Sequence, residues 1–275
     1  MLQFLLGLVL SAAIGLLGYR SGSLSRSGVF GAILTGTLIF GLGGLVWGAL
    51  LVLFFVSSSL LSHWKEAQKV AAAEKFSKGS RRDIGQALAN GGVGAALAVA
   101  NWLAPHPAWL LAYVGAIAAV TADTWATEIG VLSRRPPRLI TTLRPVPTGT
   151  SGGVTWLGTL AAFAGGVVIG VTAAALVALT RLLPWPPAAE SAASGAALAL
   201  MGAAAGVGSA LLDSLLGATV QRQYRCQVCG QITERQMHHG QPTLAVRGWP
   251  WLNNDAVNFV ASLAGALLGL LIGRG

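Results

Sequence analysis

The sequence predicts an all-α fold, a polytopic membrane helix bundle with about eight transmembrane helices. Of the 275 residues, 54% are hydrophobic and only 10% are charged, against roughly a quarter charged in an average soluble domain. The 37 glycines suit helices that pack closely in lipid, because small residues let backbones approach. This composition excludes a water-soluble globular protein and predicts a single membrane domain over residues 1–275.

Apolar segments of about twenty residues, the length that crosses a hydrocarbon core of roughly 30 Å, mark the expected spans. The first lacks a basic region and a small-residue cleavage site, so we interpret it as a retained helix and not as a signal peptide. Tight turns are expected around Gly41–Gly44 and Pro105–Pro107. The eight expected spans are 2–19, 28–42, 44–61, 84–103, 108–132, 153–180, 195–220 and 253–272.

The distribution of basic residues predicts the orientation, because lysine and arginine favour the cytoplasmic side of a membrane. With both termini outside, all of the 18 basic residues except Arg181 and Arg274 fall on cytoplasmic connections. The main cytoplasmic loops are then 62–83, 133–152 and 221–252. This asymmetry explains the net charge of +9, so we expect no nucleic-acid partner. The expected location is the bacterial cytoplasmic membrane, with the functional side facing the cytoplasm.

Acidic residues inside predicted spans are candidates for function, because an unpaired charge in the membrane costs several kcal/mol. Structural pairing with a buried arginine is the alternative. The acids share a similar predicted depth, near the cytoplasmic ends of the fifth and seventh spans and the start of the eighth. They are Asp123, Glu128, Asp213 and Asp255.

The spacing of these acids predicts which of them converge. Asp213 and Gly217 are four residues apart, on a stripe of small and polar residues that faces the bundle. Asp123 and Glu128 are five positions apart, about 140° around a helix, so one regular helix cannot direct both to one ion. Either the helix unwinds near Gly130 or the two acids have different partners.

Two polar segments near the acids carry groups that bind phosphate. The flexible amides and hydroxyls of Thr148–Gly153 can cradle an anion at the N-terminus of the sixth helix, and Lys65–Arg82 is a dense cationic cluster. Together with carboxylates for Mg²⁺, this set suits phosphoryl or nucleotidyl transfer. The alternatives are a simple hinge for the glycine-rich segment and contact with anionic lipid for the basic cluster.

The cysteines and two of the histidines lie close together in the last cytoplasmic loop. Cys226 and Cys229 form a Cys-x-x-Cys, and His238-His239 follow after eight residues. Thiolate and imidazole are the ligands of a small tetrahedral Zn²⁺ site. Such an ion would brace the loop and take no part in the reaction. Free thiols or a redox pair are the alternative.

Five motifs follow one another along nearly the whole chain. They are KGSRRDIGQALANG (78–91), ADTWATEIG (122–130), TGTSGG (148–153), DSLLGAT (213–219) and WLNNDAVN (251–258). In this order they resemble the motifs of the integral membrane family that includes plant and cyanobacterial phytyl-phosphate kinase. The resemblance implies a CTP-dependent, Mg²⁺-requiring kinase that extends an isoprenoid monophosphate to its diphosphate, the phytyl-phosphate reaction serving tocopherol biosynthesis. The Cys and His set agrees with a subset of that family.

The resemblance also implies roles for individual residues and partners. Asp123 and Asp213 would hold Mg²⁺, with Asp255 or Glu128 assisting the catalysis. The expected partners are an isoprenoid phosphate lipid, CTP or another nucleotide, and membrane lipids, and no oligomeric state is indicated. The expected nucleotide- and phosphate-binding residues are Lys78, Arg81, Arg82, Asp83, Thr148, Gly149, Thr150, Ser151, Gly152, Asn254 and Asn258.

Two other classes of protein compete with the enzyme. A cation- or proton-coupled transporter or flippase for a small or lipid-linked anion would need acids distributed across the bilayer. The sequence instead predicts acids only in the cytoplasmic half, which favours the enzyme. A noncatalytic lipid-binding scaffold would not explain the acids that cluster with an anion-binding loop.

Overall fold

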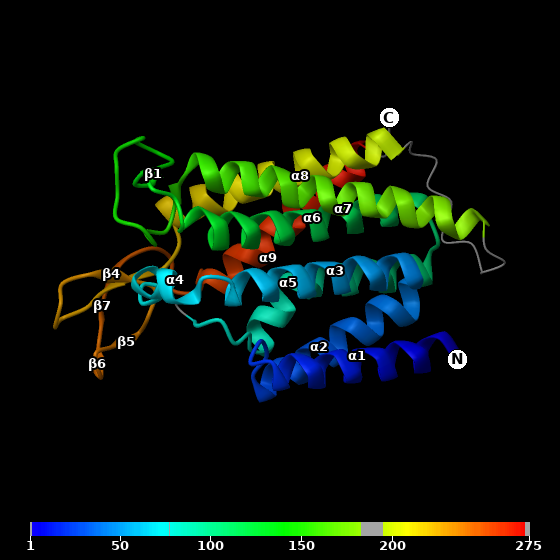
Figure 1. The fold of residues 1–275 in the computed structure, drawn as a ribbon, viewed down its shortest axis with the longest axis horizontal. Helices are drawn as coiled ribbons and strands as arrows, with labels where there is room; N and C mark the ends of the chain where they lie inside the picture. The colour runs from blue at the N-terminus through cyan, green and yellow to red at the C-terminus, as the bar shows by residue number, and fades with distance from the viewer. Residues whose placement is uncertain (1, 77, 183–194, 273–275) are drawn as a thin grey trace.

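The computed structural model describes residues 2–76, 78–182 and 195–272, and it is a bundle of long helices (Figure 1). The side chains of residues 70, 71, 73 and 181 are not described. Arg274, one of the two basic residues expected on the outer side, lies outside the described residues. The helices are α1 (Leu2–Arg20), α2 (Arg26–Leu38), α3 (Leu45–His63), α4 (Glu66–Ala73), α5 (Ile84–Leu103), α6 (Pro107–Gly130), α7 (Trp156–Leu182), α8 (Gly195–Thr219) and α9 (Asn254–Ile272), with a π-helical turn, η1 (Ile39–Gly43), after α2.

All eight predicted spans are helical, and the expected turns fall at Gly44 and before Pro107. Within the described residues, seven helices are long and apolar enough to cross a membrane: α1, α2 continued by η1, α3, α6, α7, α8 and α9. The remaining predicted span, α5, is 20 residues long but carries Gln86, Asn90 and Asn101, which lower its hydropathy. It packs against α2, α6 and α9. The polar side chains of α5 therefore lie on a helix with protein neighbours.

The central helix of the bundle is α6, which contacts α3, α5, α7, α8 and α9. Every residue from Leu110 to Ala122 is buried, as expected of a helix that is apolar on all sides. The Tyr113 hydroxyl donates a hydrogen bond to the Trp47 carbonyl at 2.7 Å, and the two rings stack. This packing fixes α6 up to the residue before Asp123.

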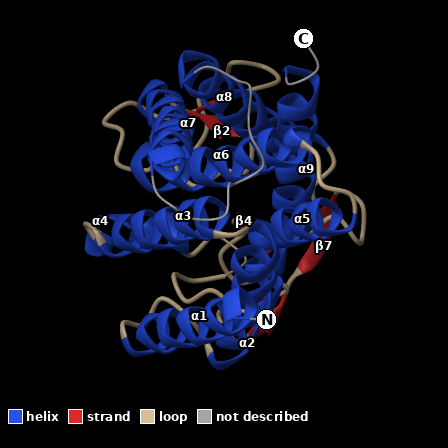
Figure 2. Cartoon of the chain, turned by 90° about the vertical axis from the view of Figure 1, so that its right-hand side faces the viewer, coloured by secondary structure: helices blue, strands red, loops and turns tan. Residues whose placement is uncertain are grey.

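Glycines allow the helices on either side of α6 to approach closely. On α8, a methyl group at Gly202 would lie 3.0 Å from the Cα of Gly170 on α7. The α7 and α8 backbones therefore touch, as the glycine content predicted. Viewed from the end in Figure 2, α1 and α2 lie at one edge of the bundle and α6–α9 at the other, with α3 and α5 between.

The long polar connections gather at one end of the bundle, which we call the polar end, and the two termini lie toward the other (Figure 1). The all-α prediction omitted several short antiparallel strands there, which form sheets of order β1-β2, β4-β3-β7 and β5-β6. Loops 62–83, 133–152 and 221–252 meet at this end. The strands are β1 (Arg138–Leu139), β2 (Gly153–Val154), β3 (Gln223–Arg225), β4 (Ile232–Thr233), β5 (Met237–His238), β6 (Gln241–Pro242) and β7 (Leu244–Arg247).

Candidate active site

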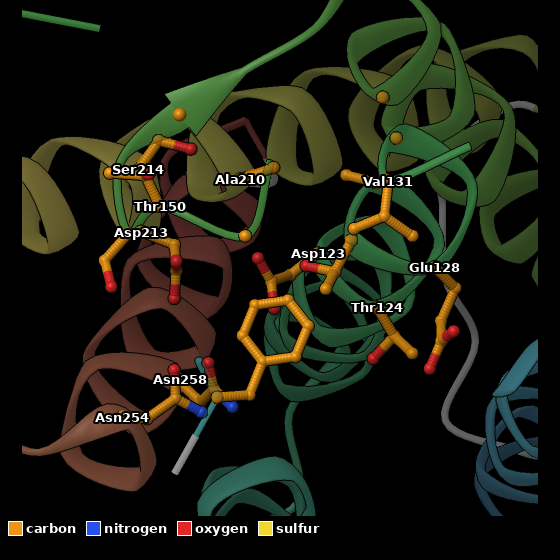
Figure 3. Close-up of a pocket in the computed structure, with 18 of the residues that line it drawn as sticks. Asp123, Thr124, Glu128, Val131, Thr150, Ala210, Asp213, Ser214, Asn254 and Asn258 are labelled. Atoms are coloured by element: carbon orange, nitrogen blue, oxygen red, sulfur yellow. The ribbon is translucent and has the colours of Figure 1, made fainter. Parts of the chain in front are cut away.

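A cavity of about 510 Å³ opens at the polar end, lined by residues of every helix from α3 to α9. Pockets of roughly 300–1,000 Å³ are typical of small-molecule and cofactor sites. Loops 62–83, 133–152 and 221–252 all contribute to its lining. The cavity therefore joins the polar loops to the ends of the membrane helices, and Figure 3 shows part of its wall.

The two acids of α6 line the cavity but point in different directions (Figure 3). The helix stays regular up to Gly130, so the second of the two predicted alternatives holds and the acids have different partners. The Glu128 carboxylate lies 2.6 Å from Lys69 Nζ and accepts a 2.6 Å hydrogen bond from the Ser62 hydroxyl. Glu128, expected to assist catalysis, is thus held in a mostly buried ion pair that joins α3, α4 and α6.

Breaking this ion pair is expected to destabilise the polar end. In Lys69→Met the Glu128 charge loses its partner, which at a mostly buried site costs about 3–5 kcal/mol. The double variant Lys69→Met/Glu128→Gln leaves no unpaired charge and should recover much of that loss. Thermal unfolding of the purified protein in detergent measures both. A double variant less stable than either single variant would contradict the pairing.

Asp213 faces Asp123 across the cavity, from α8 (Figure 3). The two carboxylates are close enough to interact electrostatically. One oxygen of Asp213, Oδ2, is buried and has no hydrogen-bond partner among the described residues. Since a buried charged oxygen requires a partner, this atom marks a place that a bound cation fits.

A third carboxylate, which the sequence analysis missed, belongs to Glu234 in the 221–252 loop. Its Oε1 accepts hydrogen bonds of 2.8 Å from the Ser151 hydroxyl and from Gln221 Nε2. Glu234 lines the same cavity and repels the charges of both Asp123 and Asp213. Three carboxylates from separate elements therefore line the same cavity, and carboxylate oxygens are the ligands that Mg²⁺ prefers.

The glycine-rich loop Thr148–Gly153 forms another wall of the cavity. Gly152 has a φ of +81°, and a methyl group there would lie 2.5 Å from the Ala218 Cβ, so the loop is pressed against the end of α8. The expected helix N-terminus lies further on: α7 begins at Trp156, after β2, and the Thr155 hydroxyl accepts a hydrogen bond from the Gly158 amide. Within the loop, the Thr150 amide and hydroxyl donate to the Pro147 carbonyl, the Gly153 amide donates to the Thr150 carbonyl, and the Ser151 hydroxyl donates to Glu234.

Lys78 lines the cavity and connects the starts of α5 and α9. Its Nζ lies 2.8 Å from Asp83 and 2.5 Å from Asp255. Burial lowers the pKa of Lys78, but the hydrogen bonds with Asp255 and Asp83 outweigh it and raise the pKa overall. Burial raises the pKa of Asp83, but the hydrogen bond and charge of Lys78 together with the backbone hydrogen bonds from Gln86 and Gly85 lower the pKa overall. The ion pair is therefore lost at low pH as the pH falls through the lowered pKa of Asp83, and at high pH as it rises through the raised pKa of Lys78.

The two predicted site residues that pair with Lys78 lie beside the cavity and not in its lining. Asp83 is the N-cap of α5 and accepts a hydrogen bond from the Gln86 amide. Asp255 is bound to Lys78, and of the described residues these two acids lie outside the cavity lining. The sequence could not show this, because Lys78 and Asp255 are 177 positions apart.

The predicted arginines separate as well. The buried guanidinium of Arg82 lines the cavity and donates a 3.0 Å hydrogen bond to the Ser59 hydroxyl. Arg81 points elsewhere and lies over the Tyr19 ring of α1. The remaining predicted ligands, Asn254 and Asn258, lie one turn apart on α9 and line the cavity (Figure 3).

The four predicted zinc ligands come together outside the cavity. The ligand atoms of Cys226, Cys229, His238 and His239 all lie within 4.8 Å of one another. Both cysteines are free thiols. Hydrogen bonds lower the pKa of the Cys226 thiol to about 7, and the bond with the Cys229 backbone makes the largest contribution. Burial acts in the opposite direction. Thiolate is the form that binds metal.

Comparison with known proteins places the chain in a family. The family model described as Integral membrane protein DUF92 matches residues 9–266. Protein PGR of Arabidopsis thaliana is 33% identical over 97% of this chain and 94% of its own length. An uncharacterized membrane protein of Methanocaldococcus jannaschii is 28% identical over 99% of this chain and 95% of its own length. Protein VTE6, chloroplastic, of Arabidopsis thaliana is 28% identical over 90% of this chain and 65% of its own length.

No solved structure matches the chain. The match to the family model includes all five motifs, and the relatives align over most of the sequence. These findings confirm the family expected from the motifs. The chain belongs to the integral membrane protein family DUF92.

Proposed function

We propose that this protein is a membrane-bound phosphotransferase, a CTP-dependent kinase that converts an isoprenoid monophosphate to its diphosphate. The observation that carries the proposal is the convergence of Asp123, Asp213 and Glu234 on one cavity that also contains the glycine-rich loop and Lys78. The motif resemblance to phytyl-phosphate kinase supports the same reaction. Phosphoryl transfer needs little more than positioning and charge neutralisation, and these residue types supply both.

The residues of the cavity match the steps of such a transfer. An oxygen of the acceptor monophosphate attacks the γ-phosphorus of CTP, the bond from that phosphorus to the bridging oxygen breaks, and CDP leaves with the electron pair. Asp123 and Asp213, with Glu234, would hold Mg²⁺, which when bound neutralises the charge of the transferred group. Lys78 and Arg82 would bind phosphate oxygens. The acceptor is already anionic, so a general base is not required.

The inner part of the cavity suits the hydrocarbon tail of a lipid. Along α8 it is lined by Val207, Ala210 and Leu211, and across from them by Ala162 of α7. Leu211 is 40% exposed. The acceptor would therefore lie with its tail between helices and its phosphate beside Asp213, while the nucleotide enters from the polar end.

The positions of the acids favour an enzyme over a transporter. Glu190 lies outside the described residues, and every described acid belongs to the polar loops or to the helix ends next to them. Proton or cation coupling would need carboxylates along a path across the bilayer. By the positive-inside rule, we assign the polar end to the cytoplasmic face of a bacterial membrane, where CTP is available.

The test of this function uses the full chain purified in detergent. Isoprenyl monophosphates of several chain lengths are supplied with Mg²⁺ and either CTP or ATP, and products are identified by mass spectrometry. We expect isoprenyl diphosphate and CDP from the wild type. If no acceptor yields diphosphate while the protein in liposomes carries a cation-coupled anion flux, the transporter is correct and the kinase is not.

A further inference from the structure

The two cysteines and two histidines of the 221–252 loop have the arrangement of a tetrahedral metal site. Their ligand atoms lie within 4.8 Å of one another. In a Zn²⁺ site with Zn–S near 2.3 Å and Zn–N near 2.0–2.1 Å, neighbouring ligand atoms are about 3.4–3.8 Å apart. Closing the cluster around an ion therefore requires side-chain shifts of only about 1 Å.

The backbone around the cluster has the shape that such an ion requires. The Val228 amide approaches Cys226 Sγ at 3.4 Å, and Gly230 turns the chain with a φ of +71°. His239 has a φ of +53°, a left-handed conformation that costs a residue with a side chain about 1–2 kcal/mol. This conformation brings the rings of His238 and His239 to 4.2 Å. Strain that aims neighbouring side chains at one point is typical of a ligand site.

The chain between the two pairs of ligands carries Glu234 into the cavity. The Cys-x-x-Cys is the turn of a short hairpin, in which β3 pairs with β4 and the Cys226 amide donates to the Gln231 carbonyl at 2.9 Å, and the chain leaves this turn along β4. Glu234 follows β4, and its carboxylate meets Ser151 and Gln221. The chain then returns to the cluster at His238. Both ends of segment 230–237, which carries Glu234, thus lie at the same four side chains.

Segment 230–237 also forms hydrogen bonds with the backbone of residues 75–76. The Thr233 hydroxyl and the Glu234 amide both donate to the Lys75 carbonyl, at 3.0 and 2.9 Å, and Arg235 Nε donates to the Phe76 carbonyl at 2.8 Å. Segment 230–237 therefore connects two polar loops at the edge of the cavity. A shift of this segment would move Glu234 and the 75–76 backbone together.

Apart from these hydrogen bonds, the loop is built from short strands. Strands β3 to β6 are two or three residues long, and hairpins of this kind are marginal on their own. Protein units shorter than about 40 residues usually need a disulfide or a metal to stay folded, and the two cysteines here are not bonded to each other. A bound ion would supply the missing constraint at the point where it positions Glu234.

We propose that Cys226, Cys229, His238 and His239 bind one Zn²⁺ ion and that this ion holds segment 230–237 so that Glu234 stays in the cavity. All four coordination positions are filled by protein, so the zinc is structural. The four ligands are positioning residues. The zinc site and its hold on segment 230–237 stand independently of the reaction, and only the effect on turnover rests on the proposed kinase function.

Metal content tests the site directly. Purified full-length protein should contain about one zinc ion per chain by elemental analysis. Cys229→Ser and His239→Ala should lose most of it, and Cys229→His, which keeps a zinc ligand, should retain it. His63→Ala is the matched control, because His63 is an exposed histidine at the end of α3, far along the chain from the cluster. Zinc-free wild-type protein that rebinds no added Zn²⁺ would overturn the proposal.

Hydrogen exchange tests the hold on Glu234 without any variant. A Zn²⁺ chelator applied to the wild type should speed amide exchange in segments 230–237 and 72–76 by about tenfold or more, and Zn²⁺, but not Mg²⁺, should reverse it. Exchange in α6 and α8 should stay unchanged. If zinc leaves without changing exchange in 230–237, the ion does not position Glu234 and the proposal fails.

Turnover separates this inference from the kinase assignment. Glu234→Ala should keep its zinc, and chelation should lower turnover far less in that variant than in the wild type, because the residue that zinc positions is already absent. An equal fractional loss in both proteins would mean that zinc only supports the fold. If the protein transfers no phosphate at all, the zinc content and exchange results still decide the zinc proposal, while the kinase proposal fails.

Discussion

Asp213→Asn is expected to lower kcat for phosphoryl transfer by about a hundredfold to a thousandfold, the usual effect of removing one charged group that acts in the transition state. The change keeps the size of the side chain and removes the charge at Oδ2, which is buried without a hydrogen-bond partner among the described residues. Because an amide is a poor ligand for Mg²⁺ compared with a carboxylate, the loss should appear mainly in kcat. Initial rates at saturating CTP measure it.

Two comparisons make the result specific to the cavity. Asp123→Asn should reduce kcat similarly, and the double variant should be little worse than either single variant, because groups that serve one ion are not additive. Asp83→Asn removes a carboxylate outside the cavity lining and keeps a side chain that caps helices well, so its loss of kcat should be small. Asp213→Asn protein with near wild-type kcat would remove Asp213 from the mechanism.

Gly152→Ala is expected to have the largest effect on the glycine-rich loop. At a φ of +81°, an added methyl group would lie 2.5 Å from Ala218 Cβ and 2.6 Å from its amide nitrogen. The left-handed backbone costs about 1–2 kcal/mol, and forcing atoms into a filled space costs a further 1–3 kcal/mol or so. The loop should leave α8, so both the unfolding temperature and the phosphate-transfer rate should fall.

Gly22 provides the matched control for this change. Its φ of +78° is nearly the same, but the nearest atom to an added methyl group is His63 Nε2, at 4.0 Å. Gly22→Ala therefore carries the backbone cost without the clash, and it lies in the turn between α1 and α2. Equal losses of stability and activity in the two variants would show that the contact between the loop and α8 has no special role.

Local patterns in the sequence were enough to predict the helices and to single out Asp123 and Asp213 as candidates. Apolar segments of membrane-spanning length set the helix positions, and Asp123 and Asp213 were found because a carboxylate within such a segment is costly. All eight predicted spans are helices, and among the described residues α5 alone of these is less apolar than a typical span, since it carries amide side chains that a protein-lined helix tolerates. These predictions depend on residues close together in the chain, which is why they could be made.

Contacts between residues far apart in the sequence could not be predicted. Glu234 lies in a polar loop, where an acidic residue is ordinary, and only the folding of the segment between Cys229 and His238 brings it to Ser151. Its position midway between the two metal-ligand pairs was the one available signal. Likewise, nothing local to Asp255 indicated its bond to Lys78.

The binding of Mn²⁺, an EPR-active substitute for Mg²⁺, tests the central claim most directly. With a nonhydrolysable CTP analogue, the wild type should bind about one Mn²⁺ per chain in the cavity. Asp213→Asn on α8 and Glu234→Gln in the 221–252 loop should each weaken that binding by about tenfold or more, while Asp83→Asn should not. Mn²⁺ affinity that is the same in all four proteins would show that carboxylates from separate elements do not share an ion, and would contradict the account.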